Sequence, residues 1–157
     1  YPLSYNGWGD VLVIIFFGFV PVGGTYYVQA LTWTPDVTIA SFICGLLIDT
    51  LLVVNNYRDR EADARSGKRT VIVRFGEKFG RYFYLLLGIS ASLLCLYFLR
   101  EGHIYAALLP QLYLVPHVLT WRRMVKIHSG KKLNSILGET SRNMLFMGIL
   151  LAIGMIL

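Results

Sequence analysis

One stretch of the chain carries most of the residue types that could do chemistry. It runs from Asn55 to Thr70 and reads NNYRDREADARSGKRT. If this stretch begins as a helix, Asn55, Asp59 and Asp63 recur at i, i+4 and i+8 and lie on one slowly turning face. Carboxylate and amide oxygens are hard ligands that suit Mg²⁺, which is commonly shared with substrate phosphates. The spacing therefore predicts a magnesium-binding face.

Basic residues surround these acids. Five of them interleave with the acidic face or follow it: Arg58, Arg60, Arg65, Lys68 and Arg69. Arginine can donate two hydrogen bonds to phosphate oxygens, lysine provides a compact charge, and Gly67 allows a tight turn beside them. The combination predicts a site for a phosphate ester. The alternative is a helix end covered by solvated ion pairs, which acids and bases at i, i+4 spacing often form.

The elements that must position this stretch are predicted to be membrane helices. Of the 157 residues, 55% are hydrophobic and 15% are charged. Because a soluble globular protein carries about 25% charged residues, this composition argues against a soluble enzyme and against a disordered chain. Five runs close to the length that spans a bilayer, uncharged except for Asp49 in the second, predict five transmembrane helices. They lie at residues 11–30, 37–56, 82–99, 104–121 and 143–157, and we expect the last to begin nearer Glu139.

The basic residues indicate how these helices are oriented. Fourteen of the 15 lysines and arginines fall in two loops, residues 57–81 and 122–142. With five spans these loops lie on the same side, and positively charged loops favour the cytoplasm. The formal net charge of +6 is thereby explained by topology, and nucleic acid is not needed as a partner. The pattern predicts a cytoplasmic N-terminus and an external C-terminus.

The central stretch closely resembles the second Asp-rich motif of the UbiA superfamily of intramembrane prenyltransferases. The resemblance extends through GKRT at 67–70 to VRFG at 73–76, in the form NNxRDxxxDxxxGKRTxxVRxG. This form is most similar to the branch that prenylates 1,4-dihydroxy-2-naphthoate in menaquinone biosynthesis. The flanks are more weakly similar: Tyr1-Pro2-Leu3, Gly7-Trp8-Gly9-Asp10, Leu133-Asn134, Gly138-Glu139-Thr140 and Asn143-Met144. These stretches are distributed from residue 1 to residue 144, so that the resemblance extends over nearly the whole chain.

The resemblance implies an all-α transmembrane bundle of about nine helices with two Asp-rich motifs. Only the motif at Asn55, Asp59 and Asp63 is found in this sequence; the first motif, which is also NxxxDxxxD-like and is expected upstream, is not. Residues 1–157 are therefore expected to form the C-terminal part of such a domain, equivalent to helices five to nine. We expect this chain by itself to be inactive, because it would hold only half of the metal site.

The resemblance also implies a reaction. A polyprenyl group would pass from polyprenyl diphosphate to 1,4-dihydroxy-2-naphthoate with Mg²⁺, giving demethylmenaquinol, CO₂ and diphosphate. Asp59 and Asp63 would be catalytic and would hold Mg²⁺ together with Asn55. The expected diphosphate-binding residues are Lys68, Arg69 and Arg58, and the candidates for an acceptor or cation pocket are Asp49, Tyr26 and Asn56. The expected location is a bacterial inner membrane, with the Asp-rich motif facing the cytoplasm.

Three other interpretations remain at this point. The acceptor could be another aromatic, such as 4-hydroxybenzoate. The chain could be half of a transporter or channel in which Asp49 and His117 line a path, since ionisable groups within a membrane often mark one. That interpretation leaves Asp59, Asp63 and the GKRT segment unexplained, and Asp49 could equally form a structural hydrogen bond. A complete chain that lacks the first motif would favour a non-catalytic membrane subunit.

Overall fold

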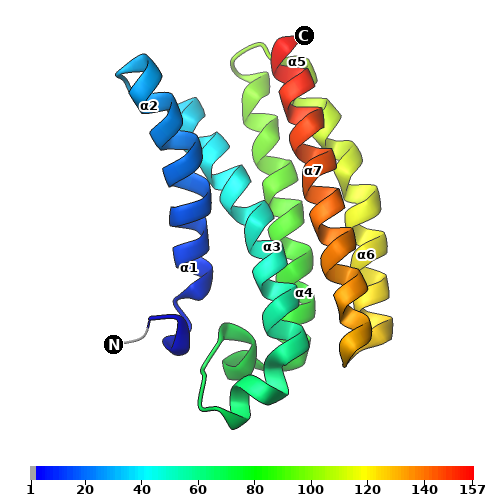
Figure 1. The fold of residues 1–157 in the computed structure, drawn as a ribbon. Helices are drawn as coiled ribbons and strands as arrows, with labels where there is room; N and C mark the ends of the chain where they lie inside the picture. The colour runs from blue at the N-terminus through cyan, green and yellow to red at the C-terminus, as the bar shows by residue number, and fades with distance from the viewer. Residues whose placement is uncertain (1–2) are drawn as a thin grey trace.

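The computed structural model describes residues 3–157, which form a bundle of long helices (Figure 1). In chain order the elements are η1 (Leu3–Asn6), α1 (Gly9–Val13), η2 (Ile14–Gly24), α2 (Thr25–Ala30), α3 (Pro35–Arg65), α4 (Val71–Leu94), η3 (Cys95–Leu99), α5 (Ile104–Leu108), η4 (Leu109–Tyr113), α6 (Leu114–Ile127), η5 (Lys131–Leu133) and α7 (Asn134–Ile156). Residues 3–157 contain no strand, which confirms the all-α prediction. Tyr1 and Pro2, which contribute to the resemblance, lie outside the described residues.

Four of the helical stretches are long and apolar enough to cross a membrane: Gly9–Ala30, Pro35–Arg65, Val71–Leu99 and Lys131–Ile156. The span predicted at residues 104–121 differs from these four. It is divided among α5, the 3₁₀ segment η4 and α6, with Pro110 in the first turn of η4. Proline has no amide hydrogen to donate and interrupts an α-helix. This stretch still runs alongside α7 as a fifth rod (Figure 1).

The loops are distributed as the charge pattern predicts. The chain termini lie at opposite ends of the bundle in Figure 1. The basic connections after α3 and after α6 lie at the same end as the N-terminus, whereas the α2–α3 and η3–α5 connections lie at the other end. The five rods therefore place both basic loops at one end, as five crossings require.

Helix α3 is the element that carries the Asp-rich stretch. At its start the Thr34 hydroxyl accepts a hydrogen bond from the Val37 amide at 3.4 Å, Pro35 occupies the first turn, and Asp36 follows. A hydroxyl cap, an early proline and an early acid all favour a helix start. From there α3 continues for 31 residues to Arg65. The condition on which the shared face depends, a helix that continues from the second span into the basic loop, is therefore met.

The rod formed by α1, η2 and α2 packs closely on α3. A Cβ atom built on Gly45 of α3 would lie only 2.9 Å from the Ile14 Cα atom. Small residues permit this kind of close approach between membrane helices. The η2 segment is π-helical and contains Pro21. Proline has no amide hydrogen to donate, which is one reason why η2 departs from a regular α-helix.

Candidate functional site

The structure places the predicted metal-binding residues on one stripe of α3. Asn55, Asp59 and Asp63 are partly exposed, whereas the neighbouring Asn56 and Tyr57 are buried. Asp59 retains 44% and Asp63 14% of its side-chain exposure. Because α3 is one α-helix from Pro35 to Arg65, these three residues at i, i+4 and i+8 lie on the same face of its C-terminal end.

The turn after α3 folds the chain back over this stripe. The Lys68 amide donates to the Asp63 carbonyl at 3.0 Å, and the Gly67 amide donates to the Ala64 carbonyl at 3.3 Å. Gly67 has φ +77°, a left-handed conformation that glycine adopts without a steric penalty and that commonly closes helices. The tight turn predicted at Gly67 is thus confirmed, and it directs Lys68 back toward the acidic face.

Each acid on the stripe has a basic partner. Arg58 donates to both oxygens of Asp59, from Nε to Oδ1 at 2.7 Å and from Nη2 to Oδ2 at 2.6 Å. The Lys68 ammonium group lies 3.4 Å from Oδ1 and 3.3 Å from Oδ2 of Asp63. In both ion pairs a basic group compensates the charge of the carboxylate, which reduces the electrostatic repulsion between the two acids. Acids and bases therefore meet at one end of α3, as both initial interpretations require.

Arg58 also connects the stripe to another helix. Its Nη1 donates to the Asn134 side-chain oxygen at 2.9 Å, and Asn134 is the first residue of α7. Arg58 thus contacts an acid of the stripe and a polar group of the last rod at the same time. The arrangement brings the start of α7 to the acidic end of α3.

The N-terminal segment closes the other side of the GKRT loop. The Arg69 amide donates to the Tyr5 carbonyl at 2.8 Å, and Arg74 Nη2 donates to the Asn6 carbonyl at 2.7 Å. Gly7 lies so close that a Cβ atom on it would be 3.1 Å from the Arg69 carbonyl oxygen. The Arg69 side chain is exposed, so its guanidinium group is available to a ligand at this end.

A small cavity of about 50 Å³ lies between these segments. Its polar lining comes from Asp10, Asn56, Lys68 and Thr70. A volume of this size accommodates a single polar group or one to two waters, since a water occupies about 30 Å³ in the liquid. Asn56 is therefore brought next to Lys68, on the side of α3 that faces α1.

Asp49 lies deeper along α3, two turns before Asn56. Its side chain is fully buried, and neither carboxylate oxygen has a hydrogen-bond partner among the described residues. A buried polar group without a partner is costly in a folded protein. The alternative of a structural hydrogen bond from Asp49 to a neighbouring helix is not realised within residues 3–157.

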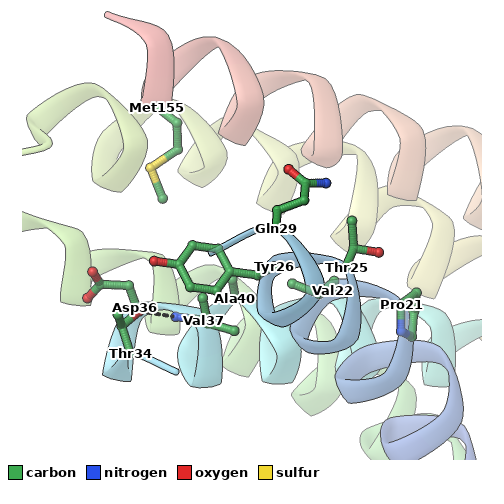
Figure 2. Close-up of a pocket in the computed structure, with 10 residues that line it drawn as sticks. All are labelled: Pro21, Val22, Thr25, Tyr26, Gln29, Thr34, Asp36, Val37, Ala40 and Met155. Atoms are coloured by element: carbon green, nitrogen blue, oxygen red, sulfur yellow. Dashed lines mark hydrogen bonds between the residues drawn. The ribbon is translucent and has the colours of Figure 1, made fainter. Parts of the chain in front are cut away.

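Tyr26 is not brought together with the acidic stripe. It lines a pocket of about 480 Å³ at the opposite end of the bundle, together with Gln29, Asp36 and Met155 (Figure 2). Asp36 and Asp59 lie 23 residues apart on the same helix. At 1.5 Å per residue this separation is about 35 Å, so Tyr26 belongs to a different region of the molecule.

The donor set of the stripe fits a magnesium ion that is shared with a substrate. Two carboxylates and an amide oxygen are hard donors, and Mg²⁺ usually takes one or two carboxylates and fills its remaining positions with water and phosphate oxygens. Among residues 3–157 no group of three or more His, Cys, Asp or Glu side chains is arranged to hold a metal. The described residues therefore provide a partial set of ligands.

Sequence reasoning missed one cluster beside this site. Glu77 of α4 accepts a hydrogen bond from Tyr57 Oη at 3.0 Å and forms ion pairs with Arg60 and Arg81. A signal was present, because Glu77 is the only acidic residue between Asp63 and Glu101 in a strongly basic stretch. Its partners become apparent only when α3 and α4 are placed side by side.

Comparison with known proteins agrees with the resemblance. Residues 1–156 match the UbiA prenyltransferase family. The 1,4-dihydroxy-2-naphthoate octaprenyltransferase of Escherichia coli is 41% identical over 95 residues, which cover 60% of this chain and 30% of that protein. The enzyme of the same name from Mycobacterium tuberculosis is 40% identical over 93 residues, which cover 59% of this chain and 32% of that protein.

A third relative matches over more of the chain. The UbiA prenyltransferase domain-containing protein 1 of Dictyostelium discoideum is 29% identical over 160 residues, covering 99% of this chain and 46% of that protein. No solved structure gives a significant match. The chain thus spans less than half of the length of each of these three relatives.

Proposed function

Because the chain belongs to the UbiA prenyltransferase family, we propose that its full-length protein transfers a polyprenyl group from polyprenyl diphosphate to 1,4-dihydroxy-2-naphthoate. The relatives with 40–42% identity that carry this name support the choice of acceptor. The observation that carries the proposal is the stripe of Asn55, Asp59 and Asp63, with Lys68 folded back over it. This arrangement suits a diphosphate bound through a metal on one side and through cations on the other.

We assign the stripe to the metal and the flanking bases to the diphosphate. Asn55, Asp59 and Asp63 would hold Mg²⁺, which when bound would neutralise charge on the leaving diphosphate. Lys68 and Arg69 would contact diphosphate oxygens directly. Arg58 and Lys68, which now compensate the two acids, would exchange carboxylate oxygens for phosphate oxygens when the substrate binds.

The chemistry itself is the substitution at an allylic carbon. The C–O bond to diphosphate breaks with its electron pair on the diphosphate, and the electron-rich naphthoate ring supplies the pair for the new C–C bond. Loss of the carboxyl group as CO₂ restores the aromatic ring. The cationic carbon must be shielded from water during this step. Apolar side chains of the bundle would provide that shielding on the membrane side of the stripe.

We propose that the acceptor binds on the α1 side of α3. The cavity beside Lys68 offers Asn56 and Asp10 as polar partners for a hydroxyl group, and Asp49 lies two turns further into the membrane. We therefore assign Asn56 and Asp49 to the acceptor side. The protein would act in a bacterial inner membrane with the stripe at the cytoplasmic surface, where the two basic loops lie.

A transfer assay tests this proposal. Membranes containing the full-length protein receive labelled polyprenyl diphosphate and Mg²⁺, with dihydroxynaphthoate in one sample and 4-hydroxybenzoate in another. We expect label in a lipid-soluble naphthoquinol in the first sample only, and at least a 100-fold loss with Asp59→Asn, since preorganised charge stabilisation is worth about this factor. Glu61→Gln, an exposed acid on the same helix, is the matched control.

The other outcomes distinguish the alternatives. Transfer to 4-hydroxybenzoate instead would retain the chemistry and overturn the acceptor. The absence of transfer to either acceptor, with inserted and folded protein, would overturn the enzyme proposal and favour a transporter or a non-catalytic subunit.

A further inference from the structure

A single carboxylate joins three helices behind the acidic stripe. Glu77 accepts hydrogen bonds from Tyr57 Oη at 3.0 Å and Arg60 Nη2 at 3.3 Å, both on α3, and from Arg81 on α4. His128, directly after α6, places Nδ1 2.8 Å from Glu77 Oε1. The Glu77 side chain, near the N-terminal end of α4, therefore contacts groups from α3, from α4 and from the end of α6.

The Glu77 network holds the side of α3 that faces away from the stripe. At about 100° per residue, Tyr57 is two residues from both Asn55 and Asp59 and therefore points about 160° away from each of them around the helix axis. Arg60 strengthens this attachment, because its Nη1 donates to the Tyr57 carbonyl at 2.6 Å and its guanidinium carbon lies 4.6 Å from the centroid of the Tyr57 ring. Tyr57 therefore attaches the network to the back of α3, and Arg60, about 100° from Asp59 and about 60° from Asp63, attaches it to one flank.

The last turns of α3 have few other attachments on that side. Residues Glu61, Ala62, Ala64 and Arg65 are all exposed. Beyond Tyr57, Arg60 and its contacts with Glu77 attach the helix end on this flank, whereas the hydrogen bond from Arg58 to Asn134 of α7 attaches it on the opposite flank. A change in the rotation of the helix end about its own axis would move Asp59 and Asp63 together, because both belong to the same helical turns.

We propose that Glu77 is a positioning residue that fixes the rotation of the α3 end and so aims Asp59 and Asp63 at the same ligand. Its effect on catalysis rests on the proposed function, whereas its effect on the helix end does not. Glu77 is directed away from the stripe and acts through Tyr57 and Arg60. Without its carboxylate, Arg60 and Arg81 would lose their shared acceptor, and the partly buried cations would repel each other.

The test uses the full-length protein in membranes with Glu77→Gln and Glu77→Asp, and with Glu61→Gln as the matched exposed control. The first readout is hydrogen exchange of the amides of residues 58–66, which requires no activity. The second is the dependence of transfer on Mg²⁺ and on each substrate. Glutamine retains the size of Glu77 but has one neutral acceptor oxygen in place of the two carboxylate oxygens that share a negative charge. Aspartate retains the charge on a shorter side chain.

We expect Glu77→Gln to accelerate exchange at residues 58–66 by about tenfold, the effect of losing a charged hydrogen-bond acceptor. The half-saturating Mg²⁺ concentration and the KM for the diphosphate should rise by a similar factor, whereas the KM for the acceptor stays within twofold. Glu77→Asp should recover part of both effects, and Glu61→Gln should match the wild type. Aspartate also serves as the informative variant if the glutamine protein does not fold.

Two results would overturn the inference. Unchanged exchange in both Glu77 variants would show that the network does not order the helix end. Faster exchange or a smaller folded fraction without a change in the Mg²⁺ and diphosphate dependence would show that Glu77 only stabilises the fold. If the wild type transfers no prenyl group, the proposed function fails, and the exchange data alone decide whether Glu77 orders this end of α3.

Discussion

Replacing Gly88 with alanine tests the packing of the helices that surround α3. The His117 ring lies directly on Gly88, and a Cβ atom there would overlap several ring atoms, including Cδ2 at 2.6 Å. The ring cannot easily move away. It is fully buried and stacked between Tyr84 and Tyr113, with ring centroids 4.8 Å and 5.0 Å away. Gly88→Ala must therefore displace His117 or separate α4 from α6.

The cost can be worked out from the contacts that would be lost. His117 Nε2 donates to the Leu85 carbonyl at 3.2 Å, and its Nδ1 accepts from Tyr113 Oη at 2.9 Å. Overfilling a packed core costs about 1–3 kcal/mol, and leaving a buried polar group unpaired costs about 1–3 kcal/mol. We therefore expect Gly88→Ala to lower the free energy of unfolding by about 3 kcal/mol.

The assay is reversible unfolding of the full-length protein in mixed micelles, followed by tryptophan fluorescence. Gly138→Ala on α7 is the matched control, because a Cβ atom there meets nothing within 4 Å and alanine favours helix. The double variant Gly88→Ala/His117→Ala should be no less stable than His117→Ala alone, since the clash partner is gone. A Gly88→Ala protein as stable as the Gly138→Ala protein would refute this account of the packing.

Three further outcomes are expected. Excess chelator should abolish prenyl transfer, and added Mg²⁺ should restore it; transfer that persists in chelator would contradict the metal assignment. Gly67→Ala should destabilise the α3–α4 turn by about 1 kcal/mol, because an L-residue is strained at φ +77°. It should also raise the KM for the diphosphate, because Lys68 would be misplaced. An unchanged KM in folded protein would show that the turn does not affect substrate binding. In intact cells, Ser129→Cys should resist a membrane-impermeant thiol reagent while Thr32→Cys reacts with it; the reverse pattern would invert the proposed topology.

The main features of the site could be predicted because they are local. Asn55, Asp59 and Asp63 share a stripe once α3 continues past the apolar run, and Gly67 marks the turn that returns Lys68 to it. The bidentate contact between Arg58 and Asp59 could not be predicted from helix spacing, since adjacent residues do not face each other on a helix. It forms because the arginine side chain is long enough to reach its neighbour.

The remaining features depend on distant contacts or on local breaks in the helices. Residues 104–121 are apolar enough to predict a span, but Pro110 divides the helix into short pieces. The hydrophobic pattern likewise does not predict that η2 is π-helical rather than α-helical. Glu77 gathers partners from α3 and α4 and from His128 after α6, and no single-sequence pattern places those three elements together.

The length of α3 supports the proposed reaction, in which charged side chains would act on a membrane substrate. Its 31 residues extend about 46 Å, whereas the hydrocarbon core of a bilayer is about 30 Å thick. The helix is therefore long enough to cross the core and to continue by several turns beyond it, and the acidic stripe lies on its last turns. In the proposed function, a diphosphate would remain there among Lys68, Arg69 and water while its apolar tail stayed beside the apolar part of the same helix. The extension of α3 would then allow one continuous element to serve both halves of an amphipathic substrate.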